Sequence, residues 1–332
     1  MSRHCSVSNA EEVTIAYQKK KRPKPQVWED EMSKVHRVHH GTFGHVCVLE
    51  LTGELVTHAH SNANVSFWLA GSPTQVSIDG VPVGHDAESA AIIDCFVPHR
   101  VMVADSSAAA QSLSFYLEPE WLAQAMPSHL PGSFAHLDTE ISPMLRDELW
   151  TLRDMLLGES SDEIELDCAL VAFLKRALMS SRNAETDAAK RAHKARDFRL
   201  RKALTLMREN VARDLDMETV ARKSGLSRAH FFSIFRDELE LTPAIFWNSL
   251  RVEEAILQMR SSPESLTAVA SSLGFNAQGN FTRFFRQRTG VAPSEYRRAL
   301  RRKRRSRAAA MADASIAQAS ETASVRELAD PS

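Results

Sequence analysis

The sequence predicts a multidomain protein, with a β-rich N-terminal domain followed by an all-α C-terminal domain. Its 332 residues exceed what one ordinary hydrophobic core holds, so two folded domains are expected. Short apolar segments separated by turn signals fill residues 35–118, which predicts strands. From residue 196 to 300, apolar residues recur at helical spacing instead. The structural class therefore changes once along the chain.

Composition excludes several classes of protein. Hydrophobic residues make up 43% of the chain and charged residues 25%, as in ordinary globular proteins. The four cysteines have no CxxC spacing, which predicts reduced thiols. No apolar run reaches the ~20 residues that span a bilayer, and the N-terminal residues lack the apolar core of a signal peptide. We therefore expect a cytoplasmic protein with no membrane partner.

The net charge of −1 conceals a strong asymmetry between the two halves. Residues 196–307 contain 23 lysines and arginines against 12 acidic residues, a net of +11, and the rest of the chain carries a net of −12. A basic segment fused to an acidic one indicates a polyanionic partner for one half only. A solvated basic surface is the alternative.

The sequence divides the chain into six parts. Residues 1–30 are expected to form a flexible tail, 31–125 a β-domain, 126–180 a helical segment, 181–195 a linker, 196–300 the all-α domain and 301–332 a disordered basic tail. Asp79-Gly80 between alternating apolar residues predicts a β-hairpin. The apolar spacing of Ile141–Leu157 and Ile164–Met179 predicts two helices, which either pair across a dimer interface or pack on their own β-domain.

An internal repeat organises the all-α domain. Residues 219–227 match residues 268–276 at an offset of 49, and Phe231, Phe235 and Pro243 recur at an offset of 50. One residue is therefore added in the turn of the second copy. A repeated motif of this length predicts two copies of one structural unit.

Each copy has the chemistry of a helix-turn-helix. Ala221 and Ala270 allow two helices to cross closely. Gly225 and Gly274 follow four residues later, where a left-handed residue can end the first helix. In the first copy, Ser227 then caps the second helix.

A linker helix is expected between the copies. Thr242 is its N-cap, Pro243 lies in its first turn, and the helix extends to about Arg260. Eighteen residues at ~1.5 Å each give roughly 27 Å. A rod of that length can hold two helices about one DNA turn apart, roughly 34 Å.

These residues resemble those of a known family. The segment GFNAQGNFTRFFRQRTGVAPSEYR, residues Gly274–Arg297, is similar to the signature of AraC/XylS-type transcription regulators, and Thr242–Ala255 resembles the linker helix of that family. The resemblance covers about 100 residues. It implies that the chain binds double-stranded DNA through the major groove.

The position of residues within the motif predicts the DNA contacts. The second recognition helix would present polar residues that can pair with bases, and the first a more apolar set. Phe232 either contacts thymine methyl groups or belongs to the core, and His230 is expected to be packed or capping. Arg236 and Arg286 are expected to contact phosphates. The full predicted set is Ser227, Arg228, Ala229, Phe232, Ser233 and Arg236 in the first copy, and Gln278, Gly279, Asn280, Arg283 and Arg286 in the second.

The β-domain resembles the cupin fold. Residues 53–64, followed by Gly71, are similar to the first cupin motif, and Val97–Arg100 to the second. The resemblance implies a small β-barrel that binds an effector and dimerises. His58 and His60 would face one way on a strand, with His99 joining them from a neighbouring strand.

Three imidazoles suit Zn, Fe, Cu or Ni, but Asn64 replaces the motif's usual glutamate ligand. We therefore expect no metal and no cofactor. The assigned effector-binding residues are His58, His60, Trp68 and His99; hydrogen bonding within the barrel, and core packing for Trp68, are the alternatives.

The sequence thus predicts a sequence-specific transcription regulator, an activator by analogy, controlled by a small-molecule effector in the barrel. Expected partners are double-stranded DNA, the effector, RNA polymerase and a second copy of the chain. No catalytic residue is assigned and the chain is not expected to be an enzyme. Two alternatives stay open: a metal-dependent cupin enzyme fused to a DNA-binding anchor, and an architectural DNA-binding protein without an effector.

Overall fold

Apolar residues alternate with polar ones through the N-terminal half, and these segments form strands. A computed structural model describes residues 33–78, 81–105, 108–126, 137–158, 162–180, 197–211 and 216–301. The predictions made for residues 1–30, 181–195 and 302–332 lie outside the described residues. The strands are β1 (Lys34–Gly41), β2 (Gly44–Leu51), β3 (Leu55–His58), β4 (Ala63–Gly71), β5 (Thr74–Ile78), β6 (Val81–His85), β7 (Ser89–Ile93), β8 (His99–Val103), β9 (Ala110–Leu117) and β10 (Leu137–Glu140).

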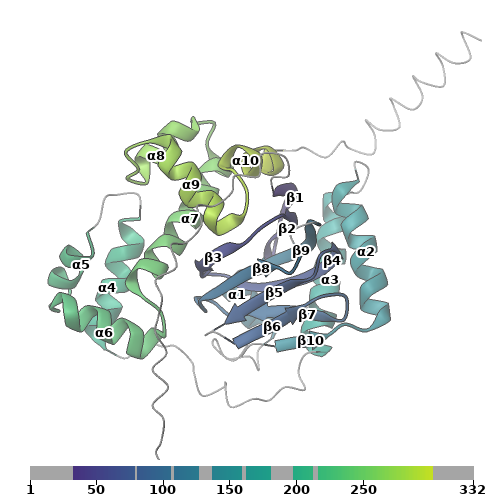
Figure 1. The fold of residues 1–332 in the computed structure, drawn as a ribbon, viewed down its shortest axis with the longest axis horizontal. Coiled ribbons are helices and arrows are strands. Elements are labelled where there is room, and N and C mark those ends of the chain that lie inside the picture. The colour runs from purple at the N-terminus through teal and green to yellow at the C-terminus, as the bar shows by residue number, and fades with distance from the viewer. Residues whose placement is uncertain are drawn as a thin grey trace, which may run out of the picture. The chain divides into compact units, whose positions relative to one another are not determined.

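The strands form two antiparallel sheets (Figure 1). One sheet has the order β1-β2-β9-β4-β7-β10 and the other the order β3-β8-β5-β6. The predicted hairpin is confirmed, because Ile78 pairs with Val81 across the turn; Asp79 and Gly80 themselves lie outside the described residues. The two sheets are separate in their hydrogen bonding among the described residues, and side chains from both line a common interior. We refer to this two-sheet domain as the barrel.

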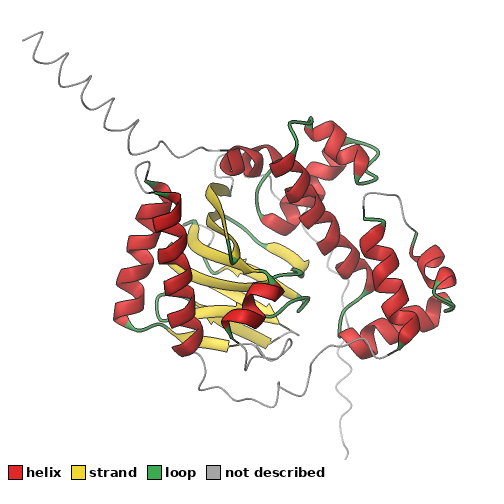
Figure 2. Ribbon diagram, turned by 180° about the vertical axis from the view of Figure 1, so that it is seen from behind, coloured by secondary structure: helices red, strands yellow, loops and turns green. Residues whose placement is uncertain are grey.

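Helix α1 (Pro119–Ala125) follows β9, and helices α2 (Pro143–Leu157) and α3 (Glu163–Ser180) follow β10. Helices α2 and α3 lie side by side along the sheets (Figure 2). Their buried leucines join the apolar core of the six-stranded sheet, and the ring of Phe173 lies 5.1 Å from that of Phe67. The two helices therefore pack on their own β-domain.

The expectation that residues 126–180 are helical was wrong at one point. Residues 137–140 form β10, which pairs with β7 so that Leu137 lies opposite Ile92 and Glu140 opposite Ser89. Without β10, one edge of β7 would present unpaired N–H and C=O groups. Pairing between residues so distant in sequence leaves no local sequence signal.

The C-terminal helices repeat as expected. They are α4 (Phe198–Glu209), α5 (Met217–Lys223), α6 (Arg228–Leu239), α7 (Pro243–Ser261), α8 (Leu266–Ser272), α9 (Gln278–Thr289) and α10 (Pro293–Arg301). The pairs α5–α6 and α8–α9 keep the offsets of 49 and 50 residues. Both helix-turn-helix units are therefore confirmed. No helix in the described part of the chain is both long and apolar enough to cross a membrane.

The turns between the paired helices have the predicted geometry. Gly225 and Gly274 adopt left-handed backbone conformations, with φ of +77° and +76°. Ala221 and Ala270 are each only 1% exposed. The hydroxyl of Ser227 accepts the N–H of His230 and so caps α6. A left-handed residue, a small buried residue and a side-chain cap thus define the first unit.

A matched pair of glycine substitutions tests this turn. An added Cβ would meet no atom within 4 Å at either Gly225 or Gly279, but only Gly225 is left-handed. We expect Gly225→Ala to lower the free energy of unfolding by about 1–2 kcal/mol through backbone strain alone. Gly279→Ala, within α9, should leave it unchanged or raise it by up to about 1 kcal/mol. Urea unfolding measures both, and equal losses would contradict the assigned conformation.

Candidate functional site

The second recognition helix, α9, separates polar from apolar side chains. Phe281, Phe284 and Phe285 are buried on one side. The five predicted DNA-contacting residues are all exposed, namely Gln278, Gly279, Asn280, Arg283 and Arg286. All five residues are therefore accessible on the surface of α9. Whether they contact DNA stays a prediction.

The charge on this side of α9 is uncompensated. None of the ion pairs among the described residues includes Arg283 or Arg286. The hydroxyl of Thr267 donates to Oε1 of Gln278 at 2.6 Å, which orients the Gln278 amide. Two free guanidiniums beside an oriented amide can engage phosphates and the edges of bases.

The first recognition helix, α6, is less polar. Ser227, Arg228, Ala229, Ser233 and Arg236 are exposed. Phe232 is half-buried, packing at an edge against Phe231 with centroids 5.8 Å apart, while the guanidinium of Arg228 lies 5.6 Å from its ring. Phe232 thus combines core contact with partial exposure.

His230 was expected to be packed or capping, and since it is exposed, the packed alternative is wrong. Its contribution to the cap is its backbone N–H. The side chain points outward because the apolar face of α6 is formed by Phe231, Ile234 and Phe235.

Helix α7 connects the two units and belongs to the cores of both. Phe246, Trp247 and Leu250 from its first half pack in the core of the first unit. Val252, Ala255 and Met259 from its second half pack in the core of the second. Thr242 caps the helix and Pro243 begins it, as predicted. The observed end at Ser261 lies one residue beyond the predicted end.

The second unit also contacts the barrel. Its core includes Val38, Leu49, Leu51 and Leu55 of strands β1–β3. Gln278, Arg283 and Arg286 line a cleft of about 570 Å³ together with residues 52–55 of the barrel. The side of α9 that carries these predicted DNA-contacting residues therefore faces the barrel across this cleft.

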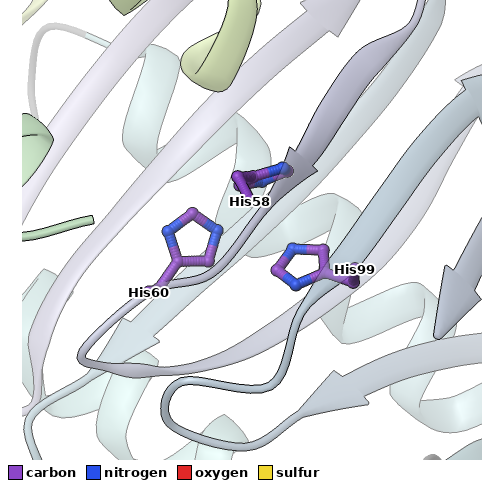
Figure 3. A group of neighbouring side chains, drawn as sticks. All are labelled: His58, His60 and His99. Carbon is purple, nitrogen blue, oxygen red and sulfur yellow. The ribbon is translucent and has the colours of Figure 1, made fainter. Parts of the chain in front are cut away.

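The four predicted effector-binding residues share one cavity inside the barrel. His58, His60, Trp68 and His99 all line a space of about 50 Å³ between the two sheets. His58 ends β3 and lies opposite His99 at the start of β8, and His60 follows just after β3 (Figure 3). The three rings lie close, with centroids 4.3 to 5.2 Å apart.

Burial sets the protonation of these rings. It lowers the pKa of His58 and of His60 well below the ordinary histidine value, and neighbouring histidines lower it further. Burial also lowers the pKa of His99 to about 4. All three imidazoles are therefore neutral at neutral pH and can each offer a lone pair.

Sequence reasoning missed other polar residues of the cavity. Tyr116 stacks on His45 with centroids 4.5 Å apart and meets His60 edge-on at 5.0 Å. His85 forms a 2.5 Å hydrogen bond with the hydroxyl of Thr74. Tyr116 alternates with Ser112 and Ser114 along β9, a period-2 pattern that could have marked an inward polar face.

The family model for a helix-turn-helix domain matches residues 220–299, which include both recognition helices. An uncharacterised helix-turn-helix transcriptional regulator of Haemophilus influenzae is 24% identical over 186 residues. That match covers 56% of this chain and 61% of the relative, less than two thirds of its length. The probable transcription factor PqrA of Proteus vulgaris is 30% identical over 83 residues, covering 25% of this chain and 68% of that protein.

A solved structure extends the likeness to both domains. Apo ToxT of Vibrio cholerae, with one lysine-to-alanine substitution, superposes with a TM-score of 0.51 at 14% identity. The superposition covers 80% of this chain and all of the other, which shows a shared fold. Together with the two repeated units and their turn geometry, these matches show that the chain belongs to the AraC family of helix-turn-helix transcription regulators.

Proposed function

We propose that this protein is a sequence-specific DNA-binding transcription regulator whose barrel binds a small effector and controls the DNA-binding domain. The observation that carries the proposal is the pair of exposed recognition helices fixed on one continuous helix, α7. The excess of basic residues in this half of the chain supports a polyanionic partner. The relatives named above are transcription regulators, which favours regulation over an enzyme fused to a DNA anchor.

The dimensions of α7 suit one face of a DNA duplex. Its 19 residues extend about 28 Å at about 1.5 Å per residue. Recognition helices attached near its two ends can enter consecutive major grooves, whose centres are about 34 Å apart. One chain would thus cover two successive turns of the duplex.

The two helices differ in their chemistry for base recognition. In α9, Gln278 and Asn280 can pair with adenine and Arg283 with guanine, while Gly279 permits close approach. In α6, Ala229 and Phe232 offer apolar contacts and leave Arg228 and Ser233 as polar ones. Arg236 and Arg286 would bind phosphates and position the helices. We infer that the second unit supplies most of the sequence discrimination.

The barrel is placed to control access to α9. DNA in the major groove must contact the side of α9 that lines the cleft with residues 52–55. A cleft of about 570 Å³ has the size of a small-molecule site and is too small to admit a duplex. Binding of DNA by α9 therefore requires the barrel and this unit to separate. An effector in the barrel would shift the population between the two arrangements.

We further propose a cytoplasmic homodimer. Helices α2 and α3 bury one face on the barrel and expose an apolar set on the other, namely Met144, Trp150, Ile164 and Met179. A second copy seated there would cover these side chains. Activation through RNA polymerase follows from the family resemblance alone.

Substitution of two arginines on α9 distinguishes base recognition from phosphate binding. We expect Arg283→Ala to lose ~1–3 kcal/mol of binding to a selected DNA site and to relax the preference at one base position. Arg286→Ala should weaken binding to all sequences alike and reduce the salt slope by about 1. Lys34→Ala on β1, whose side chain is 57% exposed, changes the net charge equally and should leave binding unchanged.

Selection of bound DNA fragments, followed by affinity measurements across salt concentrations, provides both readouts. A uniform loss on every sequence with Arg283→Ala would show that this residue does not contact a base. Absence of any preferred fragment for the wild-type chain would contradict the proposed function.

Introducing a charged side chain on the exposed face of α3 tests dimerisation through α2 and α3. Ile164 is 73% exposed, so Ile164→Glu should preserve the fold while placing two carboxylates in the interface. We expect sedimentation velocity to show monomers for this variant and dimers for the wild-type chain. The control is Val81→Glu on β6, where an exposed apolar residue lies outside the proposed interface. A variant that remains dimeric would place the interface elsewhere.

A further inference from the structure

The barrel cavity contains a cluster of three histidines whose ring nitrogens face a common space. One nitrogen from each of His58, His60 and His99 lies within 4.8 Å of those of the other two. The rings surround that space from the end of β3, the residues just after it, and the start of β8 (Figure 3). We propose that these histidines bind a divalent transition-metal ion and that this ion is the effector; the second part rests on the function proposed above.

Hydrogen bonds hold two of the rings in the tautomer that metal binding requires. Nδ1 of His58 is 2.7 Å from the carbonyl oxygen of Val56, and Nδ1 of His99 is 2.9 Å from that of Val97. Because a carbonyl oxygen only accepts, each Nδ1 carries the proton. In a neutral ring the lone pair is then on Nε2. Histidine ligands of metals in proteins almost always donate their other N–H in this way.

The size of the cavity also favours an ion. A drug-sized organic ligand occupies about 300–1,000 Å³, whereas the cavity here measures about 50 Å³. One water needs roughly 10–15 Å³, so the cavity accommodates an ion with a few waters. Bonds of about 2.1 Å from a tetrahedral ion separate the nitrogens by about 3.4 Å. The observed spread of up to 4.8 Å therefore closes by at most about 1.4 Å.

The donor set indicates the class of metal. Imidazole nitrogens suit zinc, copper, nickel and iron, whereas calcium and magnesium take oxygen ligands. The sequence-based expectation of no metal rested on Asn64, whose amide donates to the carbonyl of Phe115 at 3.1 Å. Three imidazoles nonetheless form a complete protein ligand set where the fourth position is left to water. The geometry of the cluster outweighs the missing carboxylate.

The segment that carries two of the ligands also contacts the DNA-binding domain. The backbone N–H of Ser61 donates to Oε1 of Glu253 on α7 at 2.7 Å. His58 and His60 line a small gap together with Val252 of α7 and Arg288 of α9. An ion that draws His58 and His60 toward His99 therefore moves a segment bonded to α7. The metal site thus has a direct mechanical route to the two recognition helices.

Cobalt titration of the full-length protein tests the site. Protein stripped with a chelator is titrated with Co²⁺, and visible absorption of the bound ion is recorded. We expect one saturable site per chain in the wild type, with affinity at least about 100-fold weaker in His58→Gln and in His99→Gln. The matched control is His85→Gln, because His85 is buried, lines the same cavity and lies outside the cluster. It should keep the wild-type affinity.

Two further measurements exclude cobalt binding by a thiol and a loss of binding caused by misfolding of a variant. Cys168 is an exposed free thiol, so Cys168→Ser must retain the cobalt spectrum, without thiolate charge-transfer bands. Zn²⁺ should raise the thermal midpoint of the wild type and of His85→Gln, since binding to the folded state stabilises it, but not that of His58→Gln. The shift is the difference between the thermal midpoints of one variant with and without Zn²⁺, so the variants need not have equal stability without the ion.

Different results would overturn the metal site, the role of the ion as effector, and the proposed function. No cobalt site in the wild type, or a site retained in both His58→Gln and His99→Gln, overturns the metal site. Equal DNA affinity for the stripped and Zn²⁺-loaded wild-type chain overturns the ion as effector. Failure of both forms to prefer any DNA fragment contradicts the proposed function while leaving the cobalt result standing.

Discussion

One helix shared by two hydrophobic cores is the constraint on which the rest of this protein depends. The first half of α7 packs against α4–α6 and the second half against α8–α10, so neither helix-turn-helix unit can turn without disturbing the core it shares. Packed interiors resist such deformation. The helix cap at Thr242 and the proline at its first turn add local support. The distance and rotation between α6 and α9 are thus set by the geometry of an α-helix, about 1.5 Å and about 100° per residue.

The same helix links DNA recognition to the barrel. Its second half belongs to a core that continues into Val38, Leu49, Leu51 and Leu55 of the β-domain, and Glu253 accepts a backbone N–H from the segment that follows β3. Two small sites lie at the ends of this connection: the histidine cavity inside the barrel and the cleft beneath α9. A change at the histidines can therefore reach the recognition helices through packed side chains and one partly buried hydrogen bond. These contacts form a contiguous physical route for coupling between the two sites.

Local signals in the sequence were sufficient for the DNA-binding half. Gly225, Ser227, Thr242 and Pro243 each act through their own backbone or cap, so the turns and the linker helix were predicted to within one residue. The barrel depends on pairings between residues that are distant in sequence, so its strand partners could not be predicted from local signals. The joining of β10 to β7 and the packing of α2 and α3 on the sheets follow from which surfaces remain uncovered. The histidines were identified from the resemblance of residues 53–64 and 97–100 to the cupin motifs. Their approach depends on the register that sets His58 opposite His99, and Tyr116 enters the same cavity from β9.

The most direct measurement is a hydroxyl-radical footprint of the wild-type chain on its selected DNA fragment, compared with that of a variant with two residues inserted in the middle of α7. We expect each protomer of the wild type to protect two segments about 10 base pairs apart on one face of the duplex. The insertion rotates one unit by about 200° relative to the other, so only one protected segment should remain. A single protected segment per wild-type protomer, or two segments unaltered by the insertion, would contradict the claim that α7 fixes the two recognition helices for consecutive grooves.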